Sequence, residues 1–423
     1  MVLNRSGILY LGVLTLFLSA CNEPVNQNFI VNEEVKSRID STLQSYVNTG
    51  NVGGVSALIF ENDKEVYFNA FGFADRENQK PMDRETLVRI YSMTKPITGT
   101  ALMQLWENGK FDLDDPLEKY APEFSGMKVY EGVDENGEMI LVDADRPISI
   151  RDITRHTAGF PNRNDIPGLS EIMAEVDARS FENTLTVMAE KMGRTPLWFH
   201  PGTQWEYGLS VDVQAFLVER ISGQPYGEYL RANVLDPLGL DETKYYLPED
   251  ERDRLAVAYT RTGEGQLEPT PDSIANRFNF NKWPLTPGGF GLVSTIDDYM
   301  TFARMLARKG EINGTRILEP ETIELMATNH LPDSITERSW LPSKGRVGFG
   351  IDFAVRTEAP QRAEEINGIP GEFFWDGAAS TLFWVDPKND LVAVLFVQLF
   401  PYDGIGLHKN FKDAVYGKFV PEE

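Results

Sequence analysis

Two Ser-x-x-Lys pairs in the sequence have the spacing of a nucleophile and its base, Ser92 with Lys95 and Ser125 with Lys128. Residues three apart on a helix lie on the same face, so their side chains become neighbours. A serine hydroxyl needs a base to take its proton, and a lysine with the ordinary pKa of about 10.4 is charged and cannot be that base. Burial at a helix N-terminus disfavours the ammonium, so a buried lysine there can lose its proton near neutral pH.

The residues that follow each pair distinguish them. After Ser92, the sequence ITGTALMQLW indicates a buried helix, and Pro96 falls in the first turn, where a proline breaks no hydrogen bond. Ser125 lies in APEFSGMKVYEG, where proline and glycine favour a loop. We therefore expect Ser92 and Lys95 to be the reactive pair. The alternative is a structural serine at a helix N-terminus beside a lysine that reaches solvent.

Further motifs follow in the order of the active-site elements of the serine β-lactamase and penicillin-binding-protein superfamily. Tyr207, in PGTQWEYGLSVDV, resembles the Tyr-x-Asn or Tyr-x-Leu element, with Leu209 as its third residue. ISIRDITRHTAGFP resembles the family's His-Thr-Ser-Gly loop, and GGFGLVSTIDDYMTFARML resembles its glycine-rich return to the sheet. Trp375-Asp376-Gly377 stands where β-lactamases carry Lys-Thr-Gly, and a tryptophan at this place resembles the family VIII carboxylesterases. The resemblance covers nearly the whole chain.

This resemblance implies a role for each residue. Ser92 would be the acylated nucleophile, Lys95 its base or proton relay, and Tyr207 the group that activates the serine or protonates the leaving group. Tyrosine suits that role only if a cation lowers its pKa from about 10, and Lys95 is the candidate. The backbone N–H groups of Ser92 and Ala378 would form the oxyanion hole, with Ala378 on an edge strand that faces the nucleophile.

The Trp375-Asp376-Gly377 element would contact the substrate and departs from the β-lactamase pattern. The Lys-Thr-Gly lysine helps to bind the carboxylate of a β-lactam or a peptidoglycan stem peptide. An indole and a carboxylate in its place remove attraction and add repulsion, so we expect poor recognition of carboxylates. Asp376 is either a residue that selects substrates or a solvent-facing strand or turn residue. The small residues that follow let a substrate approach the strand closely.

These features predict a serine hydrolase that cleaves neutral ester bonds or related acyl bonds through an acyl-enzyme on Ser92. Its substrate would be a small-molecule acyl ester or amide. A β-lactamase or a D-Ala-D-Ala carboxypeptidase is the alternative, and the missing lysine counts against it. A third alternative is a binding protein that keeps the fold without catalysis. The presence of Ser92, Lys95 and Tyr207 together disfavours that last interpretation. The sequence carries no signal of oligomeric state.

The elements that must position these residues indicate an α+β, β-lactamase/transpeptidase-like fold. Apolar spacing predicts a helix over 33–47, and two β-rich runs on either side of Asn62-Asp63 predict a hairpin. Strand patterns return in VGFGIDFAVRT, STLFWVDP and LVAVLFVQLF, before a final helix in LHKNFKDAVYGKF. We expect an antiparallel sheet built from both chain ends and flanked by helices. The mostly helical stretch of about 111–284 would form a lobe, with the active site in the cleft between lobe and sheet.

The composition excludes several other classes of function. The 423 residues are 42% hydrophobic and carry a net charge of -24 with no basic run, which argues against nucleic acid as a partner. The glycine run GGFGLVS lacks the third glycine of a dinucleotide fingerprint and instead predicts close backbone packing beside the active site. We therefore expect no cofactor. The sequence lacks a Gly-x-Ser-x-Gly nucleophile elbow, which argues against an α/β-hydrolase. We also expect no metal, because no HExxH or paired spacing relates the four histidines, which are His156, His200, His330 and His408.

The beginning of the chain predicts export. An apolar run over 8–18 follows a basic residue and is too short for a permanent membrane span. It ends in Leu-Ser-Ala-Cys21, which resembles the lipobox of bacterial lipoproteins, and Cys21 is the single cysteine. The resemblance implies that residues 1–20 are removed and Cys21 is lipidated. Residues 21–32 would tether the hydrolase domain, 33–423, to a membrane facing the periplasm or the cell surface. A plain secretory signal is the alternative.

Overall fold

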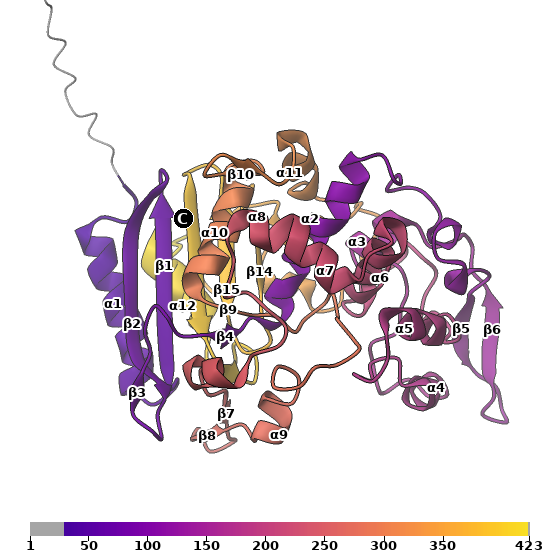
Figure 1. The fold of residues 1–423 in the computed structure, drawn as a ribbon, viewed down its shortest axis with the longest axis horizontal. Coiled ribbons are helices and arrows are strands. Elements are labelled where there is room, and N and C mark those ends of the chain that lie inside the picture. The colour runs from indigo at the N-terminus through magenta and orange to yellow at the C-terminus, as the bar shows by residue number, and fades with distance from the viewer. Residues whose placement is uncertain (1–28, 422–423) are drawn as a thin grey trace, which may run out of the picture.

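A computed structural model describes residues 29–421, and its centre is an eight-stranded antiparallel sheet (Figure 1). The strands are β1 Gly54–Glu61, β2 Lys64–Asp75, β3 Lys80–Pro81, β12 Val347–Phe349, β13 Ala354–Arg356, β14 Phe373–Asp376, β15 Leu382–Asp386 and β16 Leu391–Val397. Their order across the sheet is β12-β13-β14-β15-β16-β1-β2-β3. Because β16 pairs with β1, strands from both ends of the chain meet at the centre of the sheet. This confirms the predicted α+β fold.

The hairpin of β1 and β2 follows from its sequence. Asn62 and Asp63 at the turn have φ values of +51° and +59°, the left-handed conformation that a two-residue type I′ turn requires. Asparagine and aspartate tolerate that conformation better than other non-glycine residues. Strand β1 is almost wholly buried and β2 is largely half-exposed, so the hairpin places one strand in the middle of the sheet and the other near its edge.

Helices cover the sheet. Helix α1 (Glu33–Asn48) packs against α12 (Leu407–Tyr416), and α10 (Ile296–Ala307) packs against β15 and β16. The predicted spacing of α1 is confirmed, because Val35, Ile39 and Leu43 are buried. The side chain of Asn32 caps this helix by accepting a hydrogen bond from the Val35 N–H.

A largely helical lobe lies on one side of the sheet, at the right of Figure 1. Helix α2 (Thr94–Glu107) packs against the lobe helix α6 (Ser210–Ser222), and one hydrophobic core contains buried residues of the sheet, α2 and α6. A shared core fixes the lobe relative to the sheet. The other helices of this part are α3 Ile150–Thr154, α4 Leu169–Val176, α5 Leu185–Met192, α7 Tyr226–Leu230 and α8 Asp236–Leu238.

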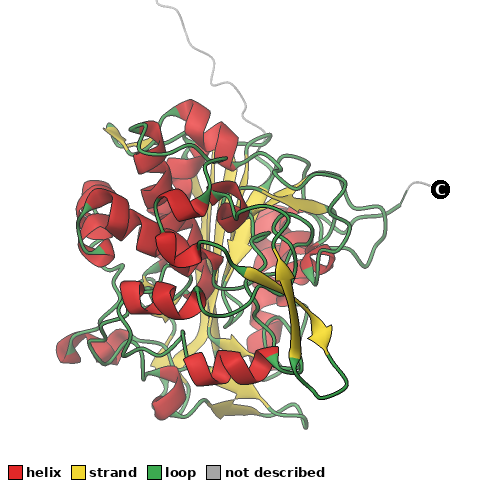
Figure 2. Cartoon of the chain, turned by 90° about the vertical axis from the view of Figure 1, so that its right-hand side faces the viewer, coloured by secondary structure: helices red, strands yellow, loops and turns green. Residues whose placement is uncertain are grey.

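Two local predictions differ from the structure. The lobe contains an exposed hairpin, β5 (Lys128–Val133) and β6 (Met139–Asp143), seen in front in Figure 2, where the sequence had shown few strand signals. The hairpin shows no alternation of apolar and polar residues because both of its faces are largely exposed. The run VGFGIDFAVRT forms β12 and β13 with a turn between them instead of one strand, and Asp352 in that turn has a φ of +65°.

The remaining elements are short. They are β4 Val88–Arg89, β7 Tyr259–Arg261, β8 Leu267–Pro269, α9 Asp272–Ala275, β9 Val293–Ser294, β10 Glu311–Ile312, β11 Thr315–Arg316, α11 Pro320–Met326 and β17 Leu399–Phe400. Over residues 29–421, no helix is both long and apolar enough to cross a bilayer. The signal sequence and Cys21 lie outside the described residues.

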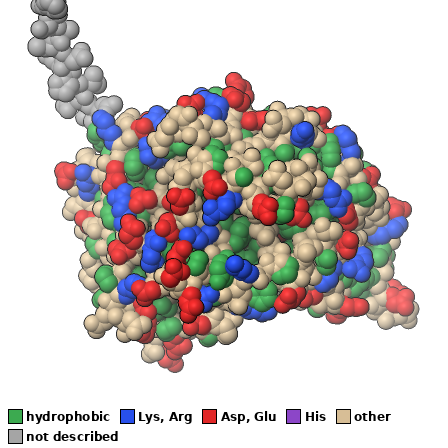
Figure 3. Space-filling model, in the orientation of Figure 1, with side chains coloured by type: hydrophobic (Ala, Val, Ile, Leu, Met, Phe, Trp, Pro, Cys, Tyr) green, Lys and Arg blue, Asp and Glu red, His purple; other side chains and the backbone are tan. Residues whose placement is uncertain are grey.

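On the face shown in Figure 3, Lys and Arg side chains lie among Asp and Glu side chains instead of gathering in a basic patch. This distribution agrees with the net charge of -24.

Candidate active site

Ser92 lies in a single 3-10 turn, Tyr91–Met93, which leads directly into the buried helix α2. The predicted helix therefore begins at Thr94, two residues after the serine. Tyr91 has a φ of +45°, a strained conformation for an aromatic residue, and turns the chain sharply between β4 and the serine. The Ser92 hydroxyl is 3.1 Å from the amine of Lys95. The predicted pair is thus in contact, whereas Ser125 lies outside any helix and Lys128 begins β5.

Lys95 is buried and has no carboxylate partner within ion-pair distance among residues 29–421. Its amine donates hydrogen bonds to the Gly289 carbonyl at 2.6 Å and to the Ser92 hydroxyl at 3.1 Å. Burial lowers the pKa of Lys95 to about 8, although the negative charges of Asp212 and Asp352 act in the opposite direction. A pKa this close to neutrality lets the amine exist in its uncharged, basic form, as a general base requires.

Asp212, in the first turn of α6, is a buried acid that the sequence analysis missed. Its carboxylate accepts a hydrogen bond of 2.9 Å from the Gly289 N–H. Burial raises the pKa of Asp212, while hydrogen bonds from the glycine backbone and the charge of Lys95 lower it. The available signal was an acidic residue within the apolar run SVDVQAFL. Such a residue is expensive to bury unless it has a partner.

Gly289 confirms the predicted close packing of the glycine run. A Cβ atom on Gly289 would lie 3.2 Å from both carboxylate oxygens of Asp212 and 3.4 Å from the Lys95 amine. The pairing of β9 with β4 brings this run beside Ser92, because β4 ends three residues before the serine. The absence of a side chain at this position lets the backbone approach both Lys95 and Asp212 without displacing either.

Tyr207, in the loop before α6, faces the same site. The Trp375 indole N–H donates to the Tyr207 hydroxyl at 3.2 Å, and the Lys95 amine lies 4.6 Å from the centre of the Tyr207 ring. We expected Lys95 to lower the pKa of this tyrosine. Instead, the amine lies over the ring face, and burial raises the pKa of Tyr207 despite hydrogen bonds to Ser92 and Trp375. Tyr207 therefore keeps its proton and is suited to donate it.

His156 supports the loop that carries Tyr207. Its ring packs 4.7 Å from the ring of Tyr207, and its Nδ1 accepts a hydrogen bond from the Gly208 N–H at 3.4 Å. Burial and the nearby charge of Lys95 hold the pKa of His156 well below its usual value. These contacts give His156 a structural role in holding the loop that carries Tyr207.

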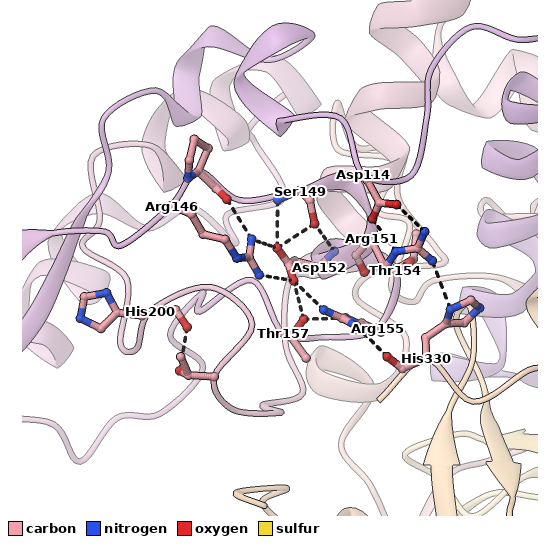
Figure 4. Close-up of polar contacts among 12 residues, drawn as sticks. Asp114, Arg146, Ser149, Arg151, Asp152, Thr154, Arg155, Thr157, His200 and His330 are labelled. Atoms are coloured by element: carbon pink, nitrogen blue, oxygen red, sulfur yellow. Dashed lines mark hydrogen bonds and ion pairs between the residues drawn. The ribbon is translucent and has the colours of Figure 1, made fainter. Parts of the chain in front are cut away.

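A buried carboxylate holds that loop in place (Figure 4). Asp152 accepts hydrogen bonds from the Ser149 backbone N–H at 2.9 Å and from the Thr157 hydroxyl at 2.8 Å. Arg146 and Arg155 pair with the same carboxylate, and Arg155 also donates to the His330 carbonyl at 2.6 Å. The network thereby joins the residues on both sides of His156 to the segment that follows α11.

Ser92 and Ala378, whose backbone N–H groups were predicted to form an oxyanion hole, line the same cavity. Strand β14 is an interior strand, so the predicted edge position of this element is wrong. Residues Phe373 and Phe374 pair with both β13 and β15, whereas the two residues that follow pair with β15 alone. The strand therefore has a free edge only at its end. A Cβ atom on Gly377 would lie 2.5 Å from the Ile90 carbonyl, so this glycine lets β14 approach the segment that carries Ser92.

The cavity beside Ser92 has a volume of about 380 Å³, within the range of small-molecule sites. It lies between Tyr207 of the lobe and the end of β14, which is the predicted cleft. Trp340 and Trp375 supply apolar walls. A second, smaller cavity of about 110 Å³ lies next to Leu209 and is lined by Phe160, Met173 and Met192.

Asp376 is buried, so the solvent-facing interpretation is wrong. It forms an ion pair with Lys344 and accepts a hydrogen bond of 2.7 Å from the Tyr402 hydroxyl. Lys344 lies in the 3-10 turn Leu341–Lys344 and Tyr402 follows β17, so neither belongs to a recognised motif. Neither residue could be recognised from the sequence, because the contact of each with Asp376 depends on packing between distant segments. Across the described part of the chain, no group of three potential ligands could hold a metal ion.

Comparisons with known proteins agree with this geometry. The model of the Beta-lactamase family matches residues 39–417. An uncharacterized protein of Mycobacterium tuberculosis is 31% identical over 85% of this chain and 89% of its own length. Lovastatin esterase of Penicillium rubens is 27% identical over 90% of this chain and 98% of its own. The solved structure of EstCE1, described as a hydrolase with promiscuous acyltransferase activity, is 27% identical, with a TM-score of 0.75 over 91% of this chain and 99% of its own. The chain therefore belongs to the Beta-lactamase family.

Proposed function

We propose that the protein is a serine hydrolase that cleaves uncharged carboxylic esters through an acyl-enzyme on Ser92. The observation that carries this proposal is the buried amine of Lys95, which is hydrogen-bonded to the Ser92 hydroxyl beside a largely apolar cavity. Burial lowers the pKa of this amine to about 8. Relatives with the activities of an esterase and an acyl-transferring hydrolase support it.

In the proposed acylation step, uncharged Lys95 accepts the Ser92 proton while the serine oxygen attacks the ester carbonyl. The N–H groups of Ser92 and Ala378 stabilise the negative oxygen of the tetrahedral intermediate. The Ala378 N–H is available for this because it has no hydrogen-bond acceptor among the described residues. Asp212 stabilises the ammonium that forms on Lys95, since its charge favours the protonated lysine.

Collapse of this intermediate breaks the bond between the carbonyl carbon and the alcohol oxygen. Tyr207 donates its proton to that oxygen and regains one from the Lys95 ammonium, so the alcohol leaves neutral. A water molecule then attacks the acyl-enzyme with Lys95 again accepting a proton, which releases the acid and restores the Ser92 hydroxyl. The high pKa of Tyr207 fits a proton donor and does not fit a resting phenolate.

The substrate class follows from the walls of the cavity. Trp340 and Trp375 favour apolar groups, and the cation at this site, Lys344, is already paired with Asp376. The carboxylate of a β-lactam or a stem peptide would have to compete with Asp376 for Lys344. The pairing therefore favours esterase over β-lactamase or carboxypeptidase activity.

The test compares the chain from residue 29 onward with two variants, Ser92→Ala and Ser125→Ala, on 4-nitrophenyl pentanoate and a chromogenic cephalosporin. We expect ester turnover that Ser92→Ala abolishes and that Ser125→Ala, at the other Ser-x-x-Lys pair, leaves intact. A fluorophosphonate followed by mass spectrometry should label Ser92. Cephalosporin turnover at equal efficiency would favour a β-lactamase, and absence of both turnover and labelling would favour a binding protein.

We also propose that the protein is exported and anchored to a membrane through a lipid on Cys21. The resemblance of its N-terminal sequence to a lipobox and the single cysteine support this. Incorporation of labelled palmitate in a bacterial host should occur for the full chain and be lost in Cys21→Ser. Incorporation that persists in the variant would contradict the proposal, and fractionation of the host cell would then locate the unanchored protein.

A further inference from the structure

Three polar side chains meet in the wall of the active-site cavity, next to its aromatic surfaces. Asp376 at the end of β14 pairs with Lys344, and the Tyr402 hydroxyl contacts both. Side-chain exposure is 4% for Lys344 and 8% for Asp376, yet both line the cavity that contains Ser92. A charged pair this well buried is costly to desolvate and seldom adds to stability. Its position beside the nucleophile instead suggests a role in recognition.

The hydrogen-bonding capacity of the pair is only partly used. The Lys344 ammonium has three N–H groups, and it donates to Asp376 Oδ2 and to the Tyr402 hydroxyl. No third acceptor for it lies among residues 29–421. Asp376 accepts both of its hydrogen bonds on Oδ2, while Oδ1 has no donor in the same part of the chain. Lys344 thus keeps one N–H and Asp376 one carboxylate oxygen without a partner in the described part of the chain, and both residues line the cavity.

Aromatic rings hold the ammonium in this position. Lys344 Nζ lies 4.1 Å from the ring centre of Tyr402, 5.3 Å from that of Trp340 and 5.7 Å from that of Trp375. Contacts with several ring faces stabilise a cation and restrict its movement. The donor is therefore preorganised within the pocket that a substrate would fill.

We infer that Lys344 and Asp376 are the specificity determinants of the proposed esterase, forming a charge-balanced anchor that binds an uncharged amide or hydroxyl group of the substrate and disfavours a carboxylate. An amide or hydroxyl can accept from Lys344 and donate to Asp376 at once. A carboxylate can only accept, so it would gain one hydrogen bond while facing the charge of Asp376. The inference rests on the proposed function.

The anchor also changes the interpretation of the Trp-Asp-Gly element. From the sequence, Asp376 was expected to add repulsion in place of the missing lysine. The structure supplies a lysine from another segment, so the two charges balance. The selectivity of the site should then depend on that balance. Removing the charge of Asp376 leaves a cation beside the substrate, and removing the charge of Lys344 leaves an anion.

The test uses two matched pairs of esters, so that the anchor is probed on either side of the scissile bond. The acyl-side pair is 4-nitrophenyl glutaramate and 4-nitrophenyl hydrogen glutarate. The alcohol-side pair is 4-(butanoyloxy)benzamide and 4-(butanoyloxy)benzoate. Ratios of kcat/KM within a pair are compared for the natural chain, Asp376→Asn and Lys344→Gln. A general loss of activity cancels in such a ratio.

In at least one pair, the natural chain should favour the amide over the carboxylate by tenfold or more. Asp376→Asn should reduce the preference for the amide by about tenfold or reverse it, because Lys344 is then free to bind the carboxylate. Lys344→Gln should increase the preference for the amide. The inference would be overturned if, for both pairs of esters, the kcat/KM ratios of both variants stay within twofold of those of the natural chain. If Ser92-dependent turnover is absent from every ester, the proposed function itself fails.

Loss of one partner from a buried ion pair can prevent folding. The double variant Lys344→Met with Asp376→Leu leaves no charge unpaired and provides a second measurement. Its preference for the amide esters over the corresponding uncharged, apolar esters, 4-nitrophenyl pentanoate and phenyl butanoate, should fall about tenfold in the pair that the anchor recognises. Amide preference that persists in this folded variant would also overturn the inference.

Discussion

The amine of Lys95 lies 3.1 Å from the hydroxyl of Ser92, in a position where burial lowers the pKa of the lysine to about 8. The contact and the pKa depend on different parts of the molecule. Helical spacing brings the two side chains together, whereas the lobe, the glycine run and the sheet exclude water from the amine.

Ester hydrolysis should increase as pH rises. If uncharged Lys95 is the base, kcat/KM for 4-nitrophenyl pentanoate should increase between pH 6 and 9 with an apparent pKa of about 8 and then reach a plateau. Lys95→Arg, which stays charged throughout this range, should abolish the increase together with most of the activity. A profile that is flat over this range in the natural chain would contradict the assignment.

Replacement of Asp212 should move that profile to lower pH. The negative charge of Asp212 raises the pKa of Lys95, so Asp212→Asn should lower this pKa further and let the amine lose its proton earlier. The plateau should also fall, because the ammonium formed during acylation loses its counter-charge. Asp236→Asn, at an exposed carboxylate on α8, serves as the matched control. An unchanged midpoint in Asp212→Asn would show that Asp212 carries no charge near Lys95.

The role of Tyr207 can be separated into its two alternatives. If Tyr207 protonates the leaving group, Tyr207→Phe should slow the hydrolysis of an alkyl ester by about 10²–10⁴-fold. The loss should be much smaller for a nitrophenyl ester, because nitrophenolate leaves without a proton. Steady-state rates on ethyl pentanoate and 4-nitrophenyl pentanoate give the comparison. Equal losses on both esters would instead favour activation of Ser92 by the tyrosine.

Gly289→Ala should disturb the base without touching the nucleophile. The added methyl group would lie 3.2 Å from the Asp212 carboxylate and 3.4 Å from the Lys95 amine, which forces one of them to move. We expect a loss of about 1–3 kcal/mol in the free energy of unfolding and a lower kcat. Gly263→Ala, where no atom lies within 4 Å of the new methyl group, should leave both unchanged. Denaturant unfolding and ester kinetics on both variants check this.

Asp152→Asn should destabilise the lobe at neutral pH. Hydrogen bonds and Arg146 hold the pKa of Asp152 below its usual value despite burial. The ionised carboxylate therefore stabilises the folded state above about pH 4, and this stabilisation is lost as pH falls through the pKa of Asp152 in the folded protein. The expected loss at pH 7 is about 3 kcal/mol, the lower end for a broken buried pair because Arg146 remains partly solvated. Urea unfolding should show that the difference in the free energy of unfolding between the natural chain and Asp152→Asn is smaller at pH 3 than at pH 7. An equal difference at both pH values would contradict a stabilising contribution from the charge of Asp152.

Local sequence patterns were enough for much of this protein. The hairpin around Asn62 and Asp63, helix α1 and the buried helix after Ser92 follow from turn chemistry and from the spacing of apolar residues, which act within a few residues of the chain. Ser92, Lys95 and Tyr207 could be proposed as site residues because their motifs follow one another in the order of the active-site elements of the superfamily that the sequence resembles. The exposed hairpin of β5 and β6 was missed because no buried face imposes an alternating pattern on it.

Long-range packing settled the properties of the site that depend on electrostatics. Asp212 lies beside Lys95, and Lys344 beside Asp376, only because separate segments pack against one another. Burial in that packing raises the pKa of Tyr207, where a neighbouring cation alone would have lowered it. It also converts Asp376 from an apparent source of repulsion into half of a balanced pair. Desolvation and Coulomb energies depend on distances in space, and residues far apart in the sequence carry no local trace of them.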